Sequence, residues 1–282
     1  MKFFPVIQNS DEWFECRRGI PTSSCFSQII NPETCMKERS KYDGALDIHN
    51  EIKNIKTVSE ELGVTEGTIK NYLKKYTPDT EPPEPELLEG AETYAHLLIA
   101  EILKGCVLRK FEPSYYMERG ALMEKEAADY YEFETGYRVD RGGFMTDDLL
   151  RWGSSPDRRV LDLDGNVIGA LEIKCPAPWT HVENLLSKGI DKKYTQQVQG
   201  QMLTGETLQF VDWVSYDDTI KPKILRVERD NKYIDILEIG LTKFDKMMND
   251  KYKELIELGV LDSIPQKTIP DITDEIEELM AG

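Results

Sequence analysis

The sequence predicts an α/β or α+β domain, with a mixed central sheet flanked by helices and a small helix-turn-helix-like insertion. Period-two alternation marks three runs in the middle of the chain, YRVDRGGFMTDD, DRRVLDLDG and NVIGALEIKC. Apolar residues recur at helical spacing before and after these runs. The chain has 282 residues, of which 40% are hydrophobic, so it can supply the core that such a domain needs.

The first 30 residues predict a short helix around SDEWFECRRG, for which Ser10 can serve as the N-cap. The next segment, PTSSCFSQIINP, is expected to stop at Pro32, because proline disfavours continuation of a helix.

Residues 40–76 differ in character. In TVSEELGVTEGTIKNYLKKY, Thr57 and Glu60 have the spacing of a capping box, and the helix that they begin is expected to end at Gly63. A three-residue turn and a second helix follow, which is the pattern of a helix-turn-helix. The Pro- and Glu-rich run 77–89 is predicted to be an exposed linker.

The remaining elements follow from the same periodicities. Two helices are predicted at 91–105 and 113–136. The three alternating runs predict an antiparallel meander with turns at Gly142-Gly143 and at Asp164-Gly165-Asn166. Next come a helix at 191–205, the strands LQFVDWVSYDD and KILRVERD, and a last helix at about 232–258. The predicted division is a core of 1–39 and 90–262, an insertion of 40–89 and an acidic tail of 263–282.

The formal net charge of −17 argues against a nucleic-acid partner at first sight, since phosphates need clustered Lys and Arg. Part of the excess is local, however. The run TPDTEPPEPELLEGAET has six acidic residues and no basic one, and PDITDEIEELMAG has five and none. A basic concave site elsewhere therefore stays possible.

The five cysteines are odd in number and never form a C-x-x-C pair, so reduced, mostly buried thiols are expected rather than disulfides or a zinc site. No apolar run approaches the roughly 18 residues of a membrane span, and the N-terminus lacks the core of a signal peptide. We expect a cytoplasmic protein without a membrane partner.

The stretch LEIKC carries charges where a buried strand is expected. On a strand Glu172 and Lys174 share one face, while Leu171 and Ile173 take the other. Asp157, just after Pro156, opens the preceding strand, and a hairpin would bring it near Glu172. Two carboxylates in one pocket repel each other unless a cation joins them, and oxygen ligands suit magnesium or manganese. The alternative is a surface hairpin with solvated charges.

Two further polar residues lie near apolar helical stripes. Glu124 shares a helix face with Ala121, Ala128 and Tyr131, and Gln197 borders the stripe of Tyr194 and Val198. Each could support a polar site, or be an ordinary satisfied residue at the edge of the core.

Together, SSPDRRV, LEIKCP and YTQQVQGQM, preceded by EWFECRRGIPTSS and RGALMEKEA, resemble the phage lambda-type exonuclease family, the YqaJ viral recombinase group of PD-(D/E)XK nucleases. The resemblance covers roughly residues 11–35 and 91–260, with five separated motifs in the family's order. The chain departs from it in a longer loop between Asp157 and Glu172 and in the 40–89 insertion.

The resemblance implies a role for each matching residue. Asp157, Glu172 and the Ile173 carbonyl would bind the catalytic Mg²⁺, with Mn²⁺ able to substitute. Lys174 would handle the attacking water, Glu124 would assist the metal site and Gln197 would orient the lysine or water. Arg17, Ser24 and Ser155 fall where the family binds the 5′-phosphate of DNA. Arginine offers a planar fork of donors to a phosphate, but taken alone these three could equally be a surface arginine and ordinary caps.

The implied activity is degradation of one strand of linear duplex DNA from its 5′ end, leaving a 3′ single-stranded tail for phage-type recombination. Implied partners are 5′-phosphorylated duplex DNA, a single-strand annealing protein and further copies of the chain in a ring trimer. The alternatives are an endonuclease or repair nuclease of the same fold, and a DNA-binding regulator with a degenerate nuclease core. The insertion itself is expected either to contact duplex DNA or to dock on a neighbouring protein surface.

Overall fold

The computed structural model describes residues 1–108 and 115–267, without the side chains of 115–118 and 121. The elements in chain order are β1 (Lys2–Phe4), α1 (Asp11–Arg17), the 3₁₀ helix η1 (Ser23–Gln28), α2 (Pro32–His49), α3 (Ile55–Leu62), α4 (Glu66–Lys75), α5 (Glu89–Lys104), α6 (Tyr115–Thr135), β2 (Arg138–Arg141), β3 (Phe144–Thr146), β4 (Gly153–Ser154), β5 (Arg158–Leu161), β6 (Val167–Lys174), α7 (Pro178–Leu186), α8 (Lys192–Thr204), β7 (Phe210–Ser215), β8 (Lys223–Glu228) and α9 (Asn231–Glu257).

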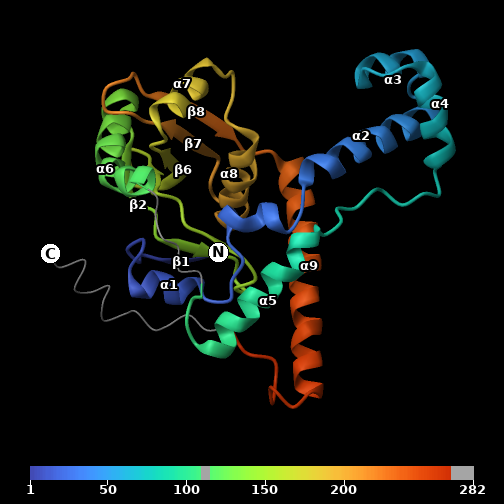
Figure 1. Ribbon diagram of the computed structural model, residues 1–282. Helices are drawn as coiled ribbons and strands as arrows, with labels where there is room; N and C mark the ends of the chain where they lie inside the picture. Colours follow the sequence, from blue (N-terminus) through green and yellow to red (C-terminus); the bar gives the residue numbers. More distant parts are fainter. Residues whose placement is uncertain (109–114, 268–282) are drawn as a thin grey trace.

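The main sheet has five strands in the order β2-β5-β6-β7-β8, and its orientation is mixed. Strands β6 and β7 are parallel, and α7 and α8 form the crossover connection that a parallel pair needs. The other neighbouring strands are antiparallel. Helix α6 packs on one face through Ala127, Ala128 and Tyr131, and α8 covers the other through Val198 and Met202. The predicted mixed sheet flanked by helices is therefore confirmed (Figure 1).

The predicted meander is right for one of its two turns and wrong for the other. Strands β5 and β6 form a hairpin, and Asp162 caps its turn by accepting from the backbone N–H groups of Asp164 and Asn166. The Gly142-Gly143 segment does not join paired strands. After it, β3 leaves the main sheet and forms a second sheet in the order β1-β3-β4.

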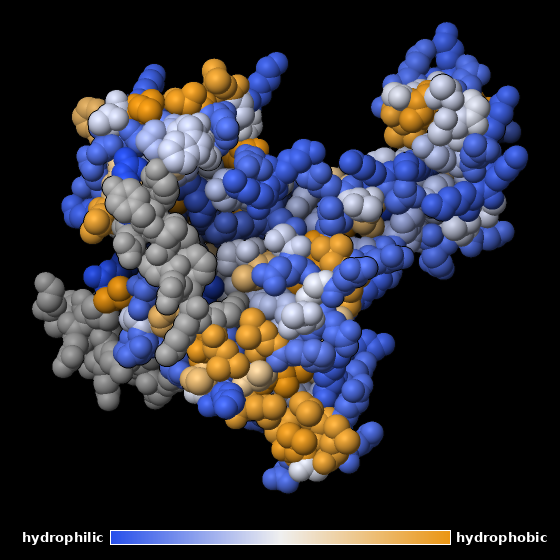
Figure 2. Space-filling view, viewed as in Figure 1, coloured by the Kyte–Doolittle hydropathy of each residue, from blue (hydrophilic) through white to orange (hydrophobic). Residues whose placement is uncertain are grey.

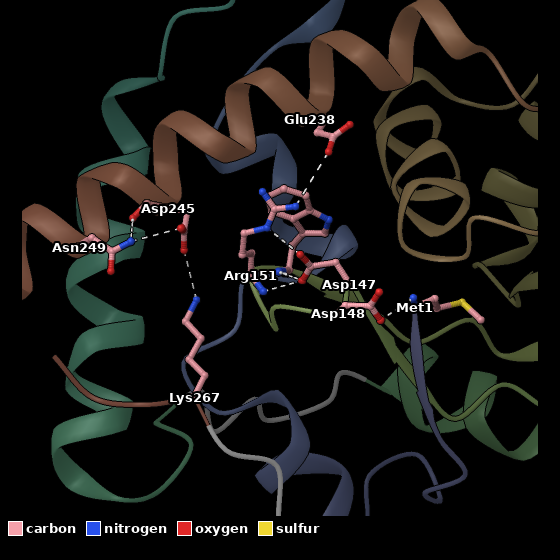
Figure 3. A network of polar contacts seen from close by, with 9 residues as sticks. Met1, Asp147, Asp148, Arg151, Glu238, Asp245, Asn249 and Lys267 are labelled. Carbon is pink, nitrogen blue, oxygen red and sulfur yellow. Dashed lines mark hydrogen bonds and ion pairs between the residues drawn. The ribbon is translucent and has the colours of Figure 1, made fainter.

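Helix α9 and the N-terminus brace this second sheet. Arg151, in the connection from β3 to β4, donates to the Asp147 carboxylate at 2.6 Å and lies 4.0 Å from Glu238 of α9 (Figure 3). The amino group of Met1 pairs with Asp148 at 2.7 Å in the same connection. Together these contacts fix the segment that runs through β4 to residue 155.

The segment after η1 differs from the prediction. Pro32 does not end an element but occupies the first turn of α2, where its missing N–H costs nothing. The 18-residue α2 carries no single apolar stripe, so its sequence pattern does not predict a helix. Residue 40, the predicted start of the insertion, falls inside this helix.

Helices α3 and α4 appear where the helix-turn-helix pattern predicts them. The cap of α3 is Asn54, whose Oδ1 accepts from the Thr57 N–H at 2.9 Å, so the predicted capping role of Thr57 is wrong. Gly63 ends the helix with φ +63°, a left-handed conformation that suits glycine.

The Pro- and Glu-rich run was predicted to be an exposed linker, and its side chains agree, but its backbone is bound to neighbouring helices. Most of its side chains are exposed, but its carbonyl oxygens are anchored. Arg39 of α2 donates to the Pro83 carbonyl at 2.8 Å, Tyr42 to that of Thr80 at 2.9 Å, and Lys243 of α9 to that of Pro85 at 3.1 Å. Prolines suit this arrangement, because they fix an extended backbone and need no partner for a missing N–H.

Candidate active site

The hairpin of β5 and β6 brings the two predicted carboxylates together. Arg158 pairs with Leu171 in the register, so Asp157 stands opposite Glu172 at the start of β5. Asp157 is further fixed by the Ile173 N–H, which donates to its Oδ2 at 2.6 Å. Residues opposite each other in an antiparallel pair share a face, so both carboxylates project towards α8.

A glycine behind this segment makes the arrangement possible. A Cβ on Gly142 would lie 1.6 Å from the Pro156 carbonyl oxygen. No other residue can therefore stand there without displacing Pro156 and Asp157. The Gly142-Gly143 pair thus serves as close backing for the strand that carries Asp157.

Glu172 lies at the centre of a polar cluster on the α8 face of the sheet. Its side chain is almost fully buried, yet both oxygens are satisfied. Oε1 accepts from Lys174 and, at 2.7 Å, from Gln197, while Oε2 accepts from Gln201. A buried carboxylate with this many charged and polar donors is costly to build for stability alone, which favours a functional role.

The glutamines of α8 divide between structure and site. Gln196 donates to the Ile30 carbonyl at 3.2 Å and Gln199 to the Glu228 carbonyl at 2.9 Å, which ties α8 to its surroundings. Gln197 and Gln201 are four residues apart, so they share the helix face that meets Glu172. The Oε1 atom of Gln201 is buried without a partner among the described residues.

The electrostatics of the cluster are strongly coupled. Burial and the adjacent Glu172 carboxylate raise the pKa of Asp157 well above its ordinary value, although the Lys174 ammonium opposes the effect. Burial alone would lower the pKa of Lys174, but the charges of Glu172 and Asp157 outweigh it and raise that pKa. The group therefore holds a lysine that keeps its proton beside two carboxylates that repel each other.

The carboxylates fit a divalent cation by their chemistry. Mg²⁺ is commonly held by one or two carboxylates, with water and substrate phosphates completing its shell. A cation between Asp157 and Glu172 would relieve the repulsion that raises the pKa of Asp157. Among residues 1–108 and 115–267, no three side chains of Asp, Glu, His and Cys gather as a ligand set.

A second polar cluster forms where α1, η1 and β4 meet. Arg17 donates through Nη1 to the Ser155 hydroxyl at 3.2 Å and through Nη2 to the Thr22 hydroxyl at 3.3 Å. The hydroxyl oxygen of Ser24 lies 3.4 Å from that of Thr22. The guanidinium carbon of Arg17 lies 3.9 Å from the centre of the Trp13 ring. The indole N–H of Trp13 also donates to the Ser155 hydroxyl at 3.0 Å.

The backbone holds this second cluster close to the first. Thr22 and Gly153 form a parallel β-bridge, and the Gly153 N–H donates to the Pro21 carbonyl at 2.9 Å. Ser155 follows two residues later and precedes Asp157 by two more. Two residues of extended chain span at most about 7 Å, so the guanidinium–hydroxyl cluster and the carboxylates lie side by side.

The sequence of residues 12–207 matches the YqaJ-like viral recombinase domain. The chain belongs to this family. Both polar clusters, from Trp13 to Gln201, lie within the matched range, so the resemblance drawn from the motifs is confirmed.

Solved structures agree on the fold of this YqaJ-like chain. An alkaline exonuclease from Laribacter hongkongensis, LHK-Exo, superposes with a TM-score of 0.60 and 24% identity, covering 89% of this chain and 98% of that one. The values are the same for LHK-Exo in complex with dAMP. A phage-related exonuclease from Haemophilus somnus 129PT shares 15% identity, with a TM-score of 0.46 over 60% of this chain and 86% of that one. No curated protein matches the sequence.

Most of the residues singled out in the YqaJ-like sequence come together. Asp157, Glu172, Lys174 and Gln197 form one cluster, and Arg17, Ser24 and Ser155 belong to the other. The roles of these residues stay predictions. Gln201, Thr22 and Trp13 were missed. Spacing alone offers a signal for two of them, since Gln201 lies four residues after Gln197 and Trp13 four residues before Arg17.

Glu124 occupies a different position from the other carboxylates. It lies on α6, on the opposite face of the sheet, and its Oε1 accepts from Arg158 at 2.6 Å. The same Arg158 nitrogen donates to the Asp157 carbonyl at 2.6 Å, so Arg158, also missed, links α6 to the site. The charge of Glu124 contributes to the raised pKa of Asp157. The side chain of Ala121, part of the predicted stripe, lies outside what the structure describes.

In the described part of the chain, no helix is both long and apolar enough to cross a membrane. The five cysteines are free, but only Cys16 and Cys35 are fully buried, so the expectation of mostly buried thiols is wrong. The predicted acidic tail lies outside the described residues from 268 onwards.

Proposed function

We propose that the chain is a Mg²⁺-dependent exodeoxyribonuclease that degrades one strand of linear duplex DNA in the 5′-to-3′ direction and leaves 3′ single-stranded tails for phage-type recombination. One observation carries the proposal. A pair of carboxylates, the buried Glu172 and the half-buried Asp157, lies with a paired lysine next to an arginine and three hydroxyls. Hydrolysis needs the first group, and capture of a terminal phosphate suits the second.

The spacing of the two clusters favours an exonuclease over an endonuclease. At most about 7 Å of extended backbone separates Ser155 from Asp157, which is comparable with the distance between neighbouring phosphates on one strand. A 5′-phosphate held by Arg17, Thr22, Ser24 and Ser155 would therefore place the next phosphodiester at the carboxylates. An endonuclease has no strand end for which such a pocket would be needed.

Each residue has a defined part in this reaction. Asp157, Glu172 and the Ile173 carbonyl would hold the metal, and Mn²⁺ should substitute for Mg²⁺. When bound, such an ion polarises the phosphate and lowers the pKa of water. Lys174 would orient the attacking water, held in place by its ion pair with Glu172. Gln197 and Gln201 fix the Glu172 carboxylate, and Glu124 would assist through Arg158.

The similarity to known exonucleases supports the proposed activity. LHK-Exo shares the fold and was solved with dAMP, a mononucleotide of the kind that an exonuclease releases. As in the resemblance above, we propose that a single-strand annealing protein takes up the 3′ tails and that the enzyme works as a ring trimer in the cytoplasm.

The test is digestion in Mg²⁺ of three substrates, a linear duplex with 5′-phosphates, the same duplex with 5′-hydroxyls, and a closed circle. The proposal expects rapid release of mononucleotides from the first, slower release from the second and none from the circle. EDTA should stop all release. Cleavage of the circle would identify an endonuclease, and binding without any cleavage would identify a DNA-binding regulator.

Gln201→Leu should lower the catalytic rate constant, because Oε2 of the buried Glu172 loses its donor. An unsatisfied buried acceptor costs about 1–3 kcal/mol, so thermal stability should fall as well. The matched control is Gln199→Leu on the same helix, which loses a bond to the Glu228 carbonyl instead. We expect the control to lose stability but keep its kcat per folded molecule. An equal fall of kcat in both variants would make Gln201 merely structural.

A further inference from the structure

Helices α2 to α4, residues 32–76, form a projection that we call the arm (Figure 1). Its first half packs on α9. In its outer half, apolar side chains pack against one another. Val58 and Ile69 are fully buried, and Tyr42, Ala45 and Tyr76 form a small core of their own. Helix α4 packs on α2 and α3. The apolar residues that docking on a neighbouring protein surface would need are therefore already used within the arm.

The connection inside the arm has the helix spacing and the caps of a helix-turn-helix. Helix α3 ends at Gly63, and α4 begins after Thr65, whose hydroxyl accepts from the Thr68 N–H at 3.2 Å. In DNA-binding proteins of this type the second helix of the pair meets the duplex. Here that helix is α4.

The outer face of α4 is polar and carries available cations. At 100° per residue, Asn71 and Lys74 lie nearly opposite the buried Ile69, and Lys70 flanks them. All three are exposed. Lys75 is committed to Glu38 at 3.0 Å, whereas no ion pair of Lys70 or Lys74 exists within residues 1–108 and 115–267.

The charge of the arm differs from that of the rest of the chain. Residues 32–76 contain eight acidic and eight basic residues, while the whole chain carries a formal net charge of −17. The entire negative excess therefore lies outside the arm. Figure 2 shows the visible surface of the arm as mostly hydrophilic apart from a small apolar patch near its tip, so little apolar surface is left for a protein partner.

The arm is also braced. The bonds of Arg39 and Tyr42 to the carbonyls of the returning Pro/Glu run hold α2, and Lys243 ties the same run to α9 through Glu84 at 2.8 Å. Helix α2 has 18 residues and is about 27 Å long. That length equals about eight base pairs of duplex DNA.

We propose that the arm is a second duplex-binding site, in which Lys70, Asn71 and Lys74 of α4 contact the phosphate backbone away from the strand end. The inference deepens the proposed function, on which it rests, by giving the enzyme a grip on undigested duplex. Contacts to phosphates without base reading fit an enzyme that must pass over any sequence.

The experiment compares wild-type protein with the double variant Lys70→Glu/Lys74→Glu on a duplex of about 30 base pairs, long enough to span the arm. Binding is measured by fluorescence anisotropy in EDTA over a range of salt concentrations. We expect the Kd to rise at least about tenfold, and the slope of log K against log salt to fall by about 2, one for each lost phosphate contact. A matched control, Lys232→Glu/Lys246→Glu on the exposed side of α9, changes the net charge equally and should leave the slope unchanged.

An unchanged Kd and slope in a folded Lys70→Glu/Lys74→Glu variant would overturn the inference and leave protein docking as the function of the arm. Equal effects in the control would also overturn it, because net charge would then explain the loss. The binding measurement does not depend on cleavage. If the wild-type protein degrades no DNA but the arm variant still loses affinity, the proposed nuclease fails and the second site stands.

Discussion

Replacing Asp157 by Asn or Ala, or Glu172 by Gln or Ala, should abolish the proposed cleavage of duplex DNA in Mg²⁺ while leaving duplex binding largely intact. Each change removes one of the two carboxylates that would hold the metal, whereas the guanidinium and hydroxyls of the second cluster stay in place. Metal-assisted stabilisation is worth several kcal/mol, so the rate should fall by about a thousandfold or more. Lys174→Ala should act nearly as strongly.

The measurement is single-turnover release of nucleotides from a 5′-phosphorylated duplex, with binding measured separately in EDTA. Glu206→Gln serves as a control, because it neutralises an exposed carboxylate after the end of α8. Thermal unfolding separates catalytic loss from misfolding, which matters because Glu172 is buried. Wild-type turnover in any of the variants at Asp157 or Glu172 would show that the catalytic carboxylates lie elsewhere.

Arg17→Ala should slow digestion of 5′-phosphorylated ends far more than digestion of 5′-hydroxyl ends. Of the two kinds of end, only the phosphorylated one brings a negative charge to the guanidinium, and a charge-assisted hydrogen bond is worth about 1.5–3 kcal/mol. The rate on phosphorylated ends should therefore fall about ten- to a hundredfold, and the preference for phosphorylated over hydroxyl ends should shrink by the same factor.

The neighbouring arginine offers a matched control. Arg18 pairs with Glu15 and donates to the Gly105 carbonyl at 3.0 Å, so it takes no part in the cluster around Ser155. Arg18→Ala should keep the preference of the wild-type protein. If Arg17→Ala slows both kinds of end equally, Arg17 supports the fold through Trp13 and Thr22 and does not recognise the phosphate.

Local pattern was enough to predict the centre of the site. Alternation places Glu172 and Lys174 on one face, and the short turn at Asp164-Gly165-Asn166 fixes a hairpin that sets Asp157 opposite Glu172. Helical spacing in the same way placed Gln197 next to this face. These relations depend on residues close in sequence, so local sequence patterns are enough to predict them.

Relations across the chain were harder to foresee. The parallel pairing of β6 with β7 depends on a crossover, and α7 within it went unrecognised. Glu124 lies on the far face of the sheet because α6 packs there, which its own stripe cannot reveal. The Pro/Glu run looks unpacked by composition, yet its carbonyls, which composition does not describe, find donors on α2 and α9.

The two ends of the excursion that carries the arm touch each other. Ile30 and Leu87 form an antiparallel bridge, and the Leu88 N–H donates to the Ile29 carbonyl at 2.8 Å. A segment that leaves and re-enters a fold at one point can be exchanged without moving the rest. The part of the arm beyond its contacts with α9 can thus be replaced by another module, by gene rearrangement or by design. A different binding domain placed there would redirect the same chemistry to a new target.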